Sequence, residues 1–323
     1  MKVGILGAGR IAEVISNTLR AMAEAECYAI ASRTLEKAQA FASEHGFAKA
    51  YGSYEELLQD PEVELVYIAT PHSHHYECMK MCIRAHKPVL CEKSFTVNAK
   101  QAREIAELAT KEQVFVTEAI WPRYMPSRNM INEVLASGVI GNVKMMTANL
   151  SYVIDHKARI VDPALAGGAL LDVGVYGINF MLMHLGKDIE RIESTVQMTD
   201  RGVDGQESIT VTYKDGTMAV LTHGIFVRSD RKGIFYGDKG YVIVENINNP
   251  ECIEIYDTND NLIEKKDVPA QITGYEYEFL EAKRCLEEGK LQSDSMPLAE
   301  TVYMMELMDG IRKDWGLVYP GEE

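Results

Sequence analysis

The segment KVGILGAGRIA, residues 2–12, determines the fold expected for the N-terminal part of the chain. It opens with a short apolar run typical of a buried strand, and apolar residues at helical spacing begin at Arg10. Gly7, Gly9 and Ala12 form the pattern Gly-x-Gly-x-x-Ala. In such a strand–turn–helix unit, glycine permits a tight turn and close approach of a pyrophosphate, while alanine lets the helix pack on the strand. We therefore predict a dinucleotide-binding turn, the alternative being a tight turn without a ligand.

The first 120 residues repeat this alternation of apolar runs and helices. Further apolar runs lie at residues 27–31, 65–69, 88–91 and 114–117, and segments with helical spacing separate them. Short, wholly apolar strands between helices indicate a parallel sheet that is covered on both faces. Right-handed crossovers make this α/β arrangement a Rossmann doubly wound parallel sheet. We assign it to residues 1–120 as an NAD(P)-binding domain.

The pattern changes after Trp121. Helical segments at residues 125–137 and 168–185 are followed by alternating runs with short turns between them, such as Lys214-Asp215-Gly216. A succession of strands joined by short turns predicts an antiparallel sheet. We expect residues 121–323 to form a C-terminal α+β domain with a large, open, mainly antiparallel sheet.

The charge of the chain argues against several classes of partner. There are 33 Lys and Arg against 48 Asp and Glu, a formal net charge of −15. Nucleic-acid binding needs clustered basic residues, so none is expected. The longest uncharged run, residues 173–186, has 14 residues, whereas a membrane span needs about 20 apolar residues. No membrane association is expected, and without a secretory signal pattern the expected location is cytoplasmic.

Cysteines and histidines give no metal site. The six cysteines are scattered, which fits a reducing compartment and provides no disulfide framework. Cys78 and Cys82 lie one helical turn apart, which is more typical of a buried helix face than of a metal site. Three histidines occur within residues 72–75, with no carboxylate or thiolate beside them. We therefore predict that no metal is bound.

The residues after the second predicted strand bear on the choice between NAD and NADP. An NAD site usually carries Asp or Glu about 20 residues after the glycine motif, where it binds the ribose hydroxyls. This chain has Ser32 and Arg33 there, with Lys37 one turn further along. A guanidinium can pair with a 2′-phosphate, which a carboxylate would repel. NADP(H) is therefore the preferred cofactor, and NAD(H) is the alternative if Arg33 is only a solvated side chain.

Two more loops follow predicted strands at the same edge of the sheet. The segment TPHSHH, residues 70–75, is expected to form the wall beside the cofactor. Glu92-Lys93 ends the fourth strand, where the lysine could exchange a proton beside a nicotinamide or form a surface pair with Glu92. The residues expected at the cofactor from all these loops are Gly7, Gly9, Arg10, Ile11, Ala12, Ser32, Arg33, Lys37, Thr70, Pro71, His72, His75, Glu92 and Lys93.

Asp172 and Tyr176 stand at i, i+4 in the second domain and would project from one face of a helix. Gly168 and Gly174 make this helix thin, so that a ligand or another backbone can come close. The alternative is that both polar groups are buried and satisfied by hydrogen bonds. The residues alone leave both interpretations open.

Taken together, these motifs resemble the Gfo/Idh/MocA family of glucose–fructose oxidoreductases and inositol dehydrogenases over essentially the whole chain. EAIWPRYMP, residues 118–126, and GALLDVGVY, residues 168–176, resemble most the branch of dimeric dihydrodiol dehydrogenases and NADP-dependent D-xylose dehydrogenases. Ser94 stands where the family usually has proline. Tyr176 stands where many relatives have histidine, and tyrosine is the residue expected of this branch.

The resemblance implies that Lys93, Asp172 and Tyr176 are catalytic. Tyr176 would take the proton of the substrate hydroxyl while the hydride passes to the nicotinamide. Because a free phenol has a pKa of about 10, a neighbouring Lys93 ammonium would favour the phenolate. Asp172 would orient the substrate or the lysine.

The resemblance also implies further contacts. Trp121 and Arg123 are expected at the domain junction, where they would cover the nicotinamide. The loop of residues 152–162 is the expected substrate contact, and relatives dimerise through the C-terminal sheet, which implies a homodimer. The full set expected at the substrate is Lys93, Trp121, Asp155, His156, Arg159, Asp172 and Tyr176.

The function expected from these features is that of an NAD(P)-dependent oxidoreductase acting on a cyclic polyol. The substrate would be an aldopyranose such as D-xylose or D-glucose, or a trans-dihydrodiol. One alternative is an NAD-dependent glycosidase on the same fold, and another is a non-catalytic NADP-binding regulator.

Overall fold

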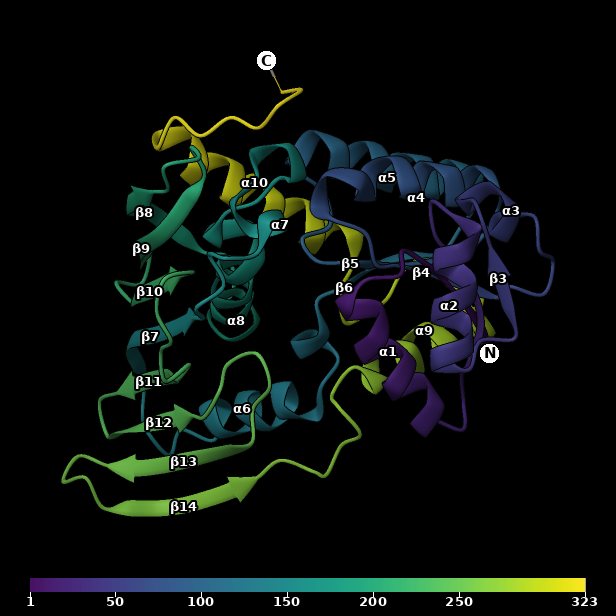
Figure 1. The fold of residues 1–323 in the computed structure, drawn as a ribbon. Helices are drawn as coiled ribbons and strands as arrows, with labels where there is room; N and C mark the ends of the chain where they lie inside the picture. Colours follow the sequence, from purple (N-terminus) through teal and green to yellow (C-terminus); the bar gives the residue numbers. More distant parts are fainter. Residues whose placement is uncertain (323) are drawn as a thin grey trace. The chain divides into compact units, whose positions relative to one another are not determined.

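The computed structural model of the chain describes residues 1–322. Two compact units are present. Unit 1 comprises Met1–Tyr124 and Gln271–Met305, and unit 2 comprises Met125–Ala270 together with the chain from Glu306 onward. Each unit has a sheet of its own (Figure 1).

Unit 1 contains a six-stranded parallel sheet with the strand order β3-β2-β1-β4-β5-β6. The predicted doubly wound sheet is therefore confirmed. Its order reverses between β1 and β4, and ligands of open α/β sheets bind at the carboxyl edge of such a switch point. The strands are β1 (Lys2–Leu6), β2 (Glu26–Ala31), β3 (Lys49–Tyr51), β4 (Leu65–Ile68), β5 (Val89–Glu92) and β6 (Val116–Ala119).

Helices cover this sheet, and several begin at a side-chain cap. Thr34, Ser53 and Asn98 each accept a hydrogen bond from a backbone N–H in the first turn of the following helix, which satisfies one of its unpaired amides. In Figure 1, α4 and α5 lie side by side over one face of the sheet. The helices of unit 1 are α1 (Arg10–Ala21), α2 (Leu35–His45), α3 (Tyr54–Leu58), α4 (His72–Arg84), α5 (Ala99–Glu112) and α9 (Glu276–Glu287).

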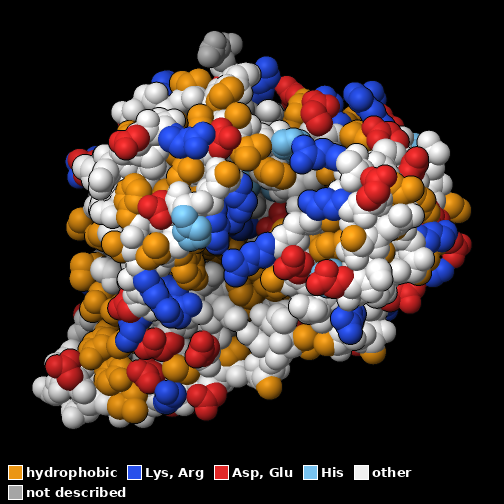
Figure 2. Space-filling view, viewed as in Figure 1, with side chains coloured by type: hydrophobic (Ala, Val, Ile, Leu, Met, Phe, Trp, Pro, Cys, Tyr) orange, Lys and Arg blue, Asp and Glu red, His pale blue; other side chains and the backbone are white. Residues whose placement is uncertain are grey.

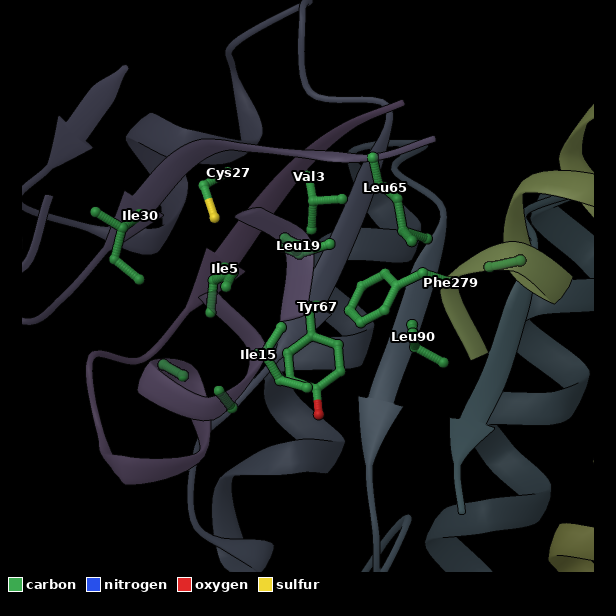
Figure 3. Close-up of a cluster of buried hydrophobic side chains, with 14 of the residues drawn as sticks. Val3, Ile5, Ile15, Leu19, Cys27, Ile30, Leu65, Tyr67, Leu90 and Phe279 are labelled. Carbon is green, nitrogen blue, oxygen red and sulfur yellow. The ribbon is translucent and has the colours of Figure 1, made fainter. Parts of the chain in front are cut away.

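Helix α9 returns from late in the sequence to complete the core of unit 1 (Figure 3). Phe279 is fully buried, and its ring centroid lies 5.5 Å from that of Tyr67 on β4. Burying a side chain of this size stabilises the fold by about 2–3 kcal/mol. The division into compact units therefore differs from the single expected boundary at residue 120, because residues 271–305 pack with the first unit.

Unit 2 contains an eight-stranded sheet with the order β14-β13-β12-β11-β7-β10-β9-β8. Its pairings are antiparallel except for the parallel pair β7–β10, so the expected mainly antiparallel sheet is confirmed. The strands are β7 (Val143–Ser151), β8 (Ile189–Met198), β9 (Asp204–Tyr213), β10 (Met218–Gly224), β11 (Gly233–Gly237), β12 (Gly240–Val244), β13 (Cys252–Asp257) and β14 (Leu262–Asp267).

The remaining helices are α6 (Pro126–Ala136), α7 (Ala158–Val161), α8 (Val175–Leu185) and α10 (Leu298–Asp314). Helix α8 packs against β7 and β10, and a π-helical turn at Leu170–Gly174 leads into it. Within residues 1–322, one helical segment, Pro163–Leu185, is apolar and long enough to span a membrane. Its apolar window is 94% buried inside the protein, as in the core helix of a soluble protein.

Candidate functional site

The glycine turn of unit 1 has the form that a dinucleotide phosphate requires. Gly7 has φ +102°, and a Cβ at this position would lie 2.9 Å from the carbonyl oxygen of Ala69, so a larger residue would be strained and crowded. Gly9 begins α1 without a side-chain cap, and a Cβ placed on it would meet nothing within 4 Å. Space is therefore open beside Gly9 at the N-terminus of α1, and a helix N-terminus favours an anion. Ala12 is fully buried beneath this turn.

The segment that follows β2 carries three of the residues expected at the cofactor. Ser32 is buried and its N–H donates to the carbonyl of Tyr51, whereas Arg33 and Lys37 are exposed. Thr34 caps α2 by accepting from the N–H of Lys37. Arg33 thus lies two residues after the end of β2, and its side chain is accessible to a phosphate group in solvent.

His75 connects the loops after β4 and β5. Its Nδ1 lies 2.8 Å from the carbonyl oxygen of Ser94, and its Nε2 lies 2.8 Å from that of Thr70. Burial lowers the pKa of His75 to about 4, although both carbonyl oxygens favour the charged form. Because both ring nitrogens have protein partners, a role for His75 at the cofactor would act through the position of these two loops. His72 is also buried, one turn before it on α4.

Lys93 follows β5 directly and lies at the carboxyl edge of the parallel sheet. Its backbone N–H donates to Glu92 Oε2 at 3.1 Å, and the Tyr67 hydroxyl donates to Glu92 Oε1. Glu92 is itself buried. The carboxylate therefore holds the backbone N–H at the base of the lysine in place.

Trp121 and Arg123 form a short 3-10 turn after β6, and both are buried. The indole stacks on the ring of Tyr275, with centroids 4.2 Å apart and planes within 6°. Arg123 Nη2 lies 3.5 Å from Glu300 Oε2. Both side chains thus have partners within unit 1 that the sequence did not indicate.

In unit 2, Asp172 lies on the π-helical turn and Tyr176 on the first turn of α8, and both are buried. A π-turn widens a helix locally and is frequent at functional sites. Arg159 Nη1 donates to Asp172 Oδ1 at 2.8 Å. The structure therefore brings together two of the expected substrate residues, Arg159 and Asp172.

The other two residues of the expected substrate loop, Asp155 and His156, are exposed. His156 Nδ1 lies 4.0 Å from Asp155 Oδ1, and both side chains are largely in solvent. Neither residue packs into the core of unit 2. Their contact with a substrate stays a prediction.

Sequence reasoning missed two groups of buried ionisable residues. Glu278 on α9 is fully buried, and burial together with the charge on Glu92 raises its pKa well above the usual range. In unit 2, Asp204, Glu207 and His223 are buried beneath the π-turn. An acidic residue at an inward-facing position of an alternating strand, such as Glu207, was the available signal. Within residues 1–322 no group of three or more His, Cys, Asp or Glu side chains is arranged to hold a metal ion.

Comparison with known proteins identifies the family. The model of the oxidoreductase family with an NAD-binding Rossmann fold, Gfo/Idh/MocA, matches residues 1–120, and that of the Gfo/Idh/MocA C-terminal domain matches residues 129–243. Trans-1,2-dihydrobenzene-1,2-diol dehydrogenase of Xenopus tropicalis is 34% identical, with 99% of each chain covered. The chain belongs to the Gfo/Idh/MocA family. The same enzyme of Homo sapiens is 32% identical, over 100% of this chain and 99% of that protein.

Solved structures of Gfo/Idh/MocA proteins agree with this identification. A 3-ketoreductase from Actinomadura kijaniata, in complex with NADP and TDP-benzene, matches with a TM-score of 0.89 and 26% identity, over 97% of each chain. An aldose-aldose oxidoreductase from Caulobacter crescentus shares the fold, with a TM-score of 0.87 and 18% identity over 97% of this chain and 96% of that one. The protein is an oxidoreductase, and its Rossmann unit is of the type that binds a nicotinamide cofactor.

Proposed function

We propose that the protein transfers a hydride between NADP(H) and a CH–OH group of a cyclic polyol. The substrate would be a trans-dihydrodiol, or an aldopyranose such as D-xylose or D-glucose. One observation carries the proposal: trans-1,2-dihydrobenzene-1,2-diol dehydrogenase of Mus musculus is 33% identical over 100% of this chain. The chain also contains the three residues proposed for the chemistry, which are Lys93, Asp172 and Tyr176.

Tyr176 would act as the base and Lys93 as its electrostatic support. When bound, the nicotinamide accepts or supplies the hydride. During oxidation the phenolate oxygen of Tyr176 takes the proton of the substrate hydroxyl, and during reduction the phenol returns it. A Lys93 ammonium near the phenolate would stabilise it, because a neighbouring positive charge favours the ionised form of a phenol.

Asp172 would orient the substrate. Its carboxylate is buried and paired with Arg159, so its direction is fixed before a ligand binds. A preorganised carboxylate can accept hydrogen bonds from the hydroxyl groups of a polyol without a further cost of ordering. Asp155 and His156, which are exposed on the neighbouring loop, would contact the more distant parts of the substrate.

NADP(H) is proposed over NAD(H) because of Arg33. The guanidinium is exposed at the end of β2, where the 2′-phosphate of a dinucleotide lies in this type of fold. No carboxylate occupies the SRT segment of residues 32–34 to repel that phosphate. Pairing with a phosphate would be bidentate and charge-assisted.

A homodimer through the sheet of unit 2 is proposed from the side chains on its outer face. Cross-strand neighbours form one continuous apolar and aromatic row across six strands. Hydrophobic side chains are visible over β13 and β14 in Figure 2. Such a face is typical of an interface between subunits. The row consists of Met218, Met145, Tyr236, Tyr241, Tyr256 and Leu262.

The cellular location is proposed to be the cytoplasm. Cysteines at positions 27, 78, 82, 91, 252 and 285 are free and buried. Unpaired thiols fit a reducing compartment. Fractionation of cells that produce the protein would test this location.

The substrate class is tested by measuring NADPH formation by absorbance with a panel of trans-dihydrodiols, aldopyranoses and inositols, with NAD in a parallel series. Turnover of one of these with NADP supports the proposal. Release of a sugar from a glycoside without net change in NADPH would replace it with the glycosidase. Tight NADPH binding without any turnover would replace it with the regulator.

A further inference from the structure

Three ionisable side chains are buried on the sheet side of the helix that carries Tyr176. Glu207 on β9 and His223 on β10 are 3% and 1% exposed and are register partners in the antiparallel pair. Glu207 Oε1 lies 2.9 Å from His223 Nδ1. Asp204, at the start of β9, is fully buried beside them, and the negative charge of Glu207 raises its pKa beyond the effect of burial.

Glycines in the helix make room for these side chains. A Cβ on Gly174 would lie 2.4 Å from Glu207 Oε1, and a Cβ on Gly177 would lie 2.0 Å from His223 Nε2. Neither glycine has an unusual φ, so the backbone alone does not require glycine there. The two glycines are therefore explained by the close approach of the carboxyl and the imidazole.

Asp204 holds the N-terminal end of the same segment. Its Oδ2 accepts a hydrogen bond of 2.5 Å from the backbone N–H of Leu170, the first residue of the π-turn. A Cβ on Gly168 would lie 2.0 Å from Asp204 Oδ1. A carboxyl oxygen that accepts from the first amide of a helical turn satisfies one of its unpaired donors and helps to fix where the turn begins.

The contacts lie on the helix face opposite to the proposed catalytic side chains. At about 100° per residue, Gly174 and Gly177 point away from Asp172 and Tyr176. The glycine face is closed by the buried side chains, and on the other face Arg159 holds Asp172 at 2.8 Å. The helical segment therefore has fixed contacts on both of these faces.

We propose that Asp204, Glu207 and His223 are positioning residues, which set the register and orientation of the turn that carries Asp172 and Tyr176. The inference rests on the proposed function of Asp172 and Tyr176. Apolar side chains at these three positions would cost less free energy to bury, because ionisable groups are unfavourable in a protein core. Directional hydrogen bonds and close glycine contacts instead allow one arrangement of the helix, which a catalytic geometry needs.

The steric part is tested with Gly177→Ala and a compensating change. The added methyl group meets the imidazole, so the helix must shift, and kcat should fall by about 100-fold, the usual cost of a displacement of about 1 Å. His223→Ala removes the imidazole that the methyl group meets. The double variant Gly177→Ala/His223→Ala should therefore have a kcat at least about tenfold higher than that of Gly177→Ala alone. Additive effects of the two substitutions on kcat would overturn the proposal.

The polar part is tested with Glu207→Gln and Asp204→Asn, which keep size and change hydrogen bonding. Both should lower kcat more than they raise KM for trans-1,2-dihydrobenzene-1,2-diol or D-xylose, with unchanged affinity for NADPH, which binds to unit 1. Ser208→Ala and Thr222→Ala are the matched controls, because these neighbours on β9 and β10 point to the outer face and form a register pair. Equal loss of kcat in the controls would overturn the proposal.

Hydrogen exchange separates this inference from the proposed function. Asp204→Asn and Glu207→Gln should increase amide exchange in residues 168–180 and leave the strands of unit 1 unchanged. If the wild type turns over no polyol, the proposed function fails, yet this exchange pattern still reports whether the three residues hold the turn. Unchanged exchange in residues 168–180 would overturn the positioning role whatever the activity.

Discussion

Arg159 and Asp172 form an ion pair with a separation of 2.8 Å, in which the carboxylate is buried and the guanidinium is half exposed. The arginine comes from the short helix α7 and the aspartate from the π-turn. The pair therefore connects the loop that precedes the turn to the turn itself. The ion pair fixes the direction of the Asp172 carboxylate, and the guanidinium of Arg159 stays partly accessible to solvent.

Arg159→Ala should lower kcat/KM for the polyol by about 10- to 100-fold, because a buried carboxylate that loses its cation changes both its energy and its direction. Arg159→Lys should recover part of the loss. The control is Arg191→Ala, since Arg191 pairs with Glu193 at an exposed position on β8. Steady-state kinetics with saturating NADP would decide, and wild-type kinetics for Arg159→Ala would show that the pair has no role in catalysis.

Lys93→Met should reduce turnover by about 100-fold or more, with NADPH affinity nearly unchanged, because the lysine acts on proton transfer. Tyr176→Phe should have a comparable effect. If the two residues act as one unit, Lys93→Met/Tyr176→Phe should be no slower than the slower single variant. Lys100→Met, at an exposed position of α5, is the control. Retention of most activity in both single variants would rule out this mechanism.

Arg33→Ala should raise KM for NADP by about 10- to 100-fold, because the variant loses a charge-assisted hydrogen bond to the 2′-phosphate. The KM for NAD, which lacks this phosphate, should stay unchanged. The variant would thereby shift the ratio of the two cofactor specificities. Arg20→Ala, at an exposed position in the last turn of α1, should change neither constant. An equal loss with both cofactors would mean that Arg33 does not contact the 2′-phosphate.

Glu278 and Glu281, one turn apart on α9, should have opposite effects on the pH dependence of stability. Burial raises the pKa of Glu278 well above its usual range, so the folded state holds this proton more tightly, and its contribution to stability is lost as pH rises above about 4.5. Burial alone would raise the pKa of Glu281, but hydrogen bonds from Arg284 and Ser293 outweigh it and lower the pKa. Its contribution is therefore lost as pH falls below about 4.5.

The measurement is the Tm of the wild type, Glu278→Gln and Glu281→Gln across this pH range. Between pH values of about 5 and 8, Glu278→Gln should lose less stability than the wild type. Glu281→Gln should follow the wild-type slope in that interval and differ from it at more acidic pH. Parallel curves for the wild type and Glu278→Gln would contradict the assignment.

A charge in the apolar row of the outer sheet face should separate the proposed dimer. Tyr241 lies at the centre of the row, with its ring stacked on that of Tyr256 at a centroid distance of 4.9 Å. Tyr241→Asp should therefore give the mass of a monomer in light scattering after size exclusion. Val318→Asp, an exposed apolar position outside the sheet, is the control. A monomeric wild type would remove the dimer proposal.

Local sequence pattern was sufficient for most of the Rossmann sheet. The apolar runs predicted at residues 27–31 and 65–69 agree within one residue with β2 and β4, because a wholly apolar run is decided by neighbouring residues. Strand β3 has three residues and α3 has five, too short for a period to be detected. Strand β8, Ile189–Met198, is half exposed and mostly polar, and it was missed because it depends on its pairing with β9.

The places of the expected site residues in the fold could be predicted where they follow directly from a strand or a turn. Lys93 at the end of β5 and the Gly7–Gly9 turn are local features of this kind. The partner of Asp172 and the stacking of Tyr275 on Trp121 depend on contacts between distant segments, which no local pattern contains. The sequence of α9 likewise holds no information on which core its buried face joins.

The return of α9 to unit 1 also has a consequence for synthesis on the ribosome. Phe279, which contacts Tyr67 in the first core, is made more than two hundred residues later. Until then, the emerging Rossmann sheet has the apolar surface around β4 uncovered, and such surface is prone to aggregate or to bind chaperones. The first unit to begin folding is therefore completed only near the end of translation, after the sheet of unit 2 has been made.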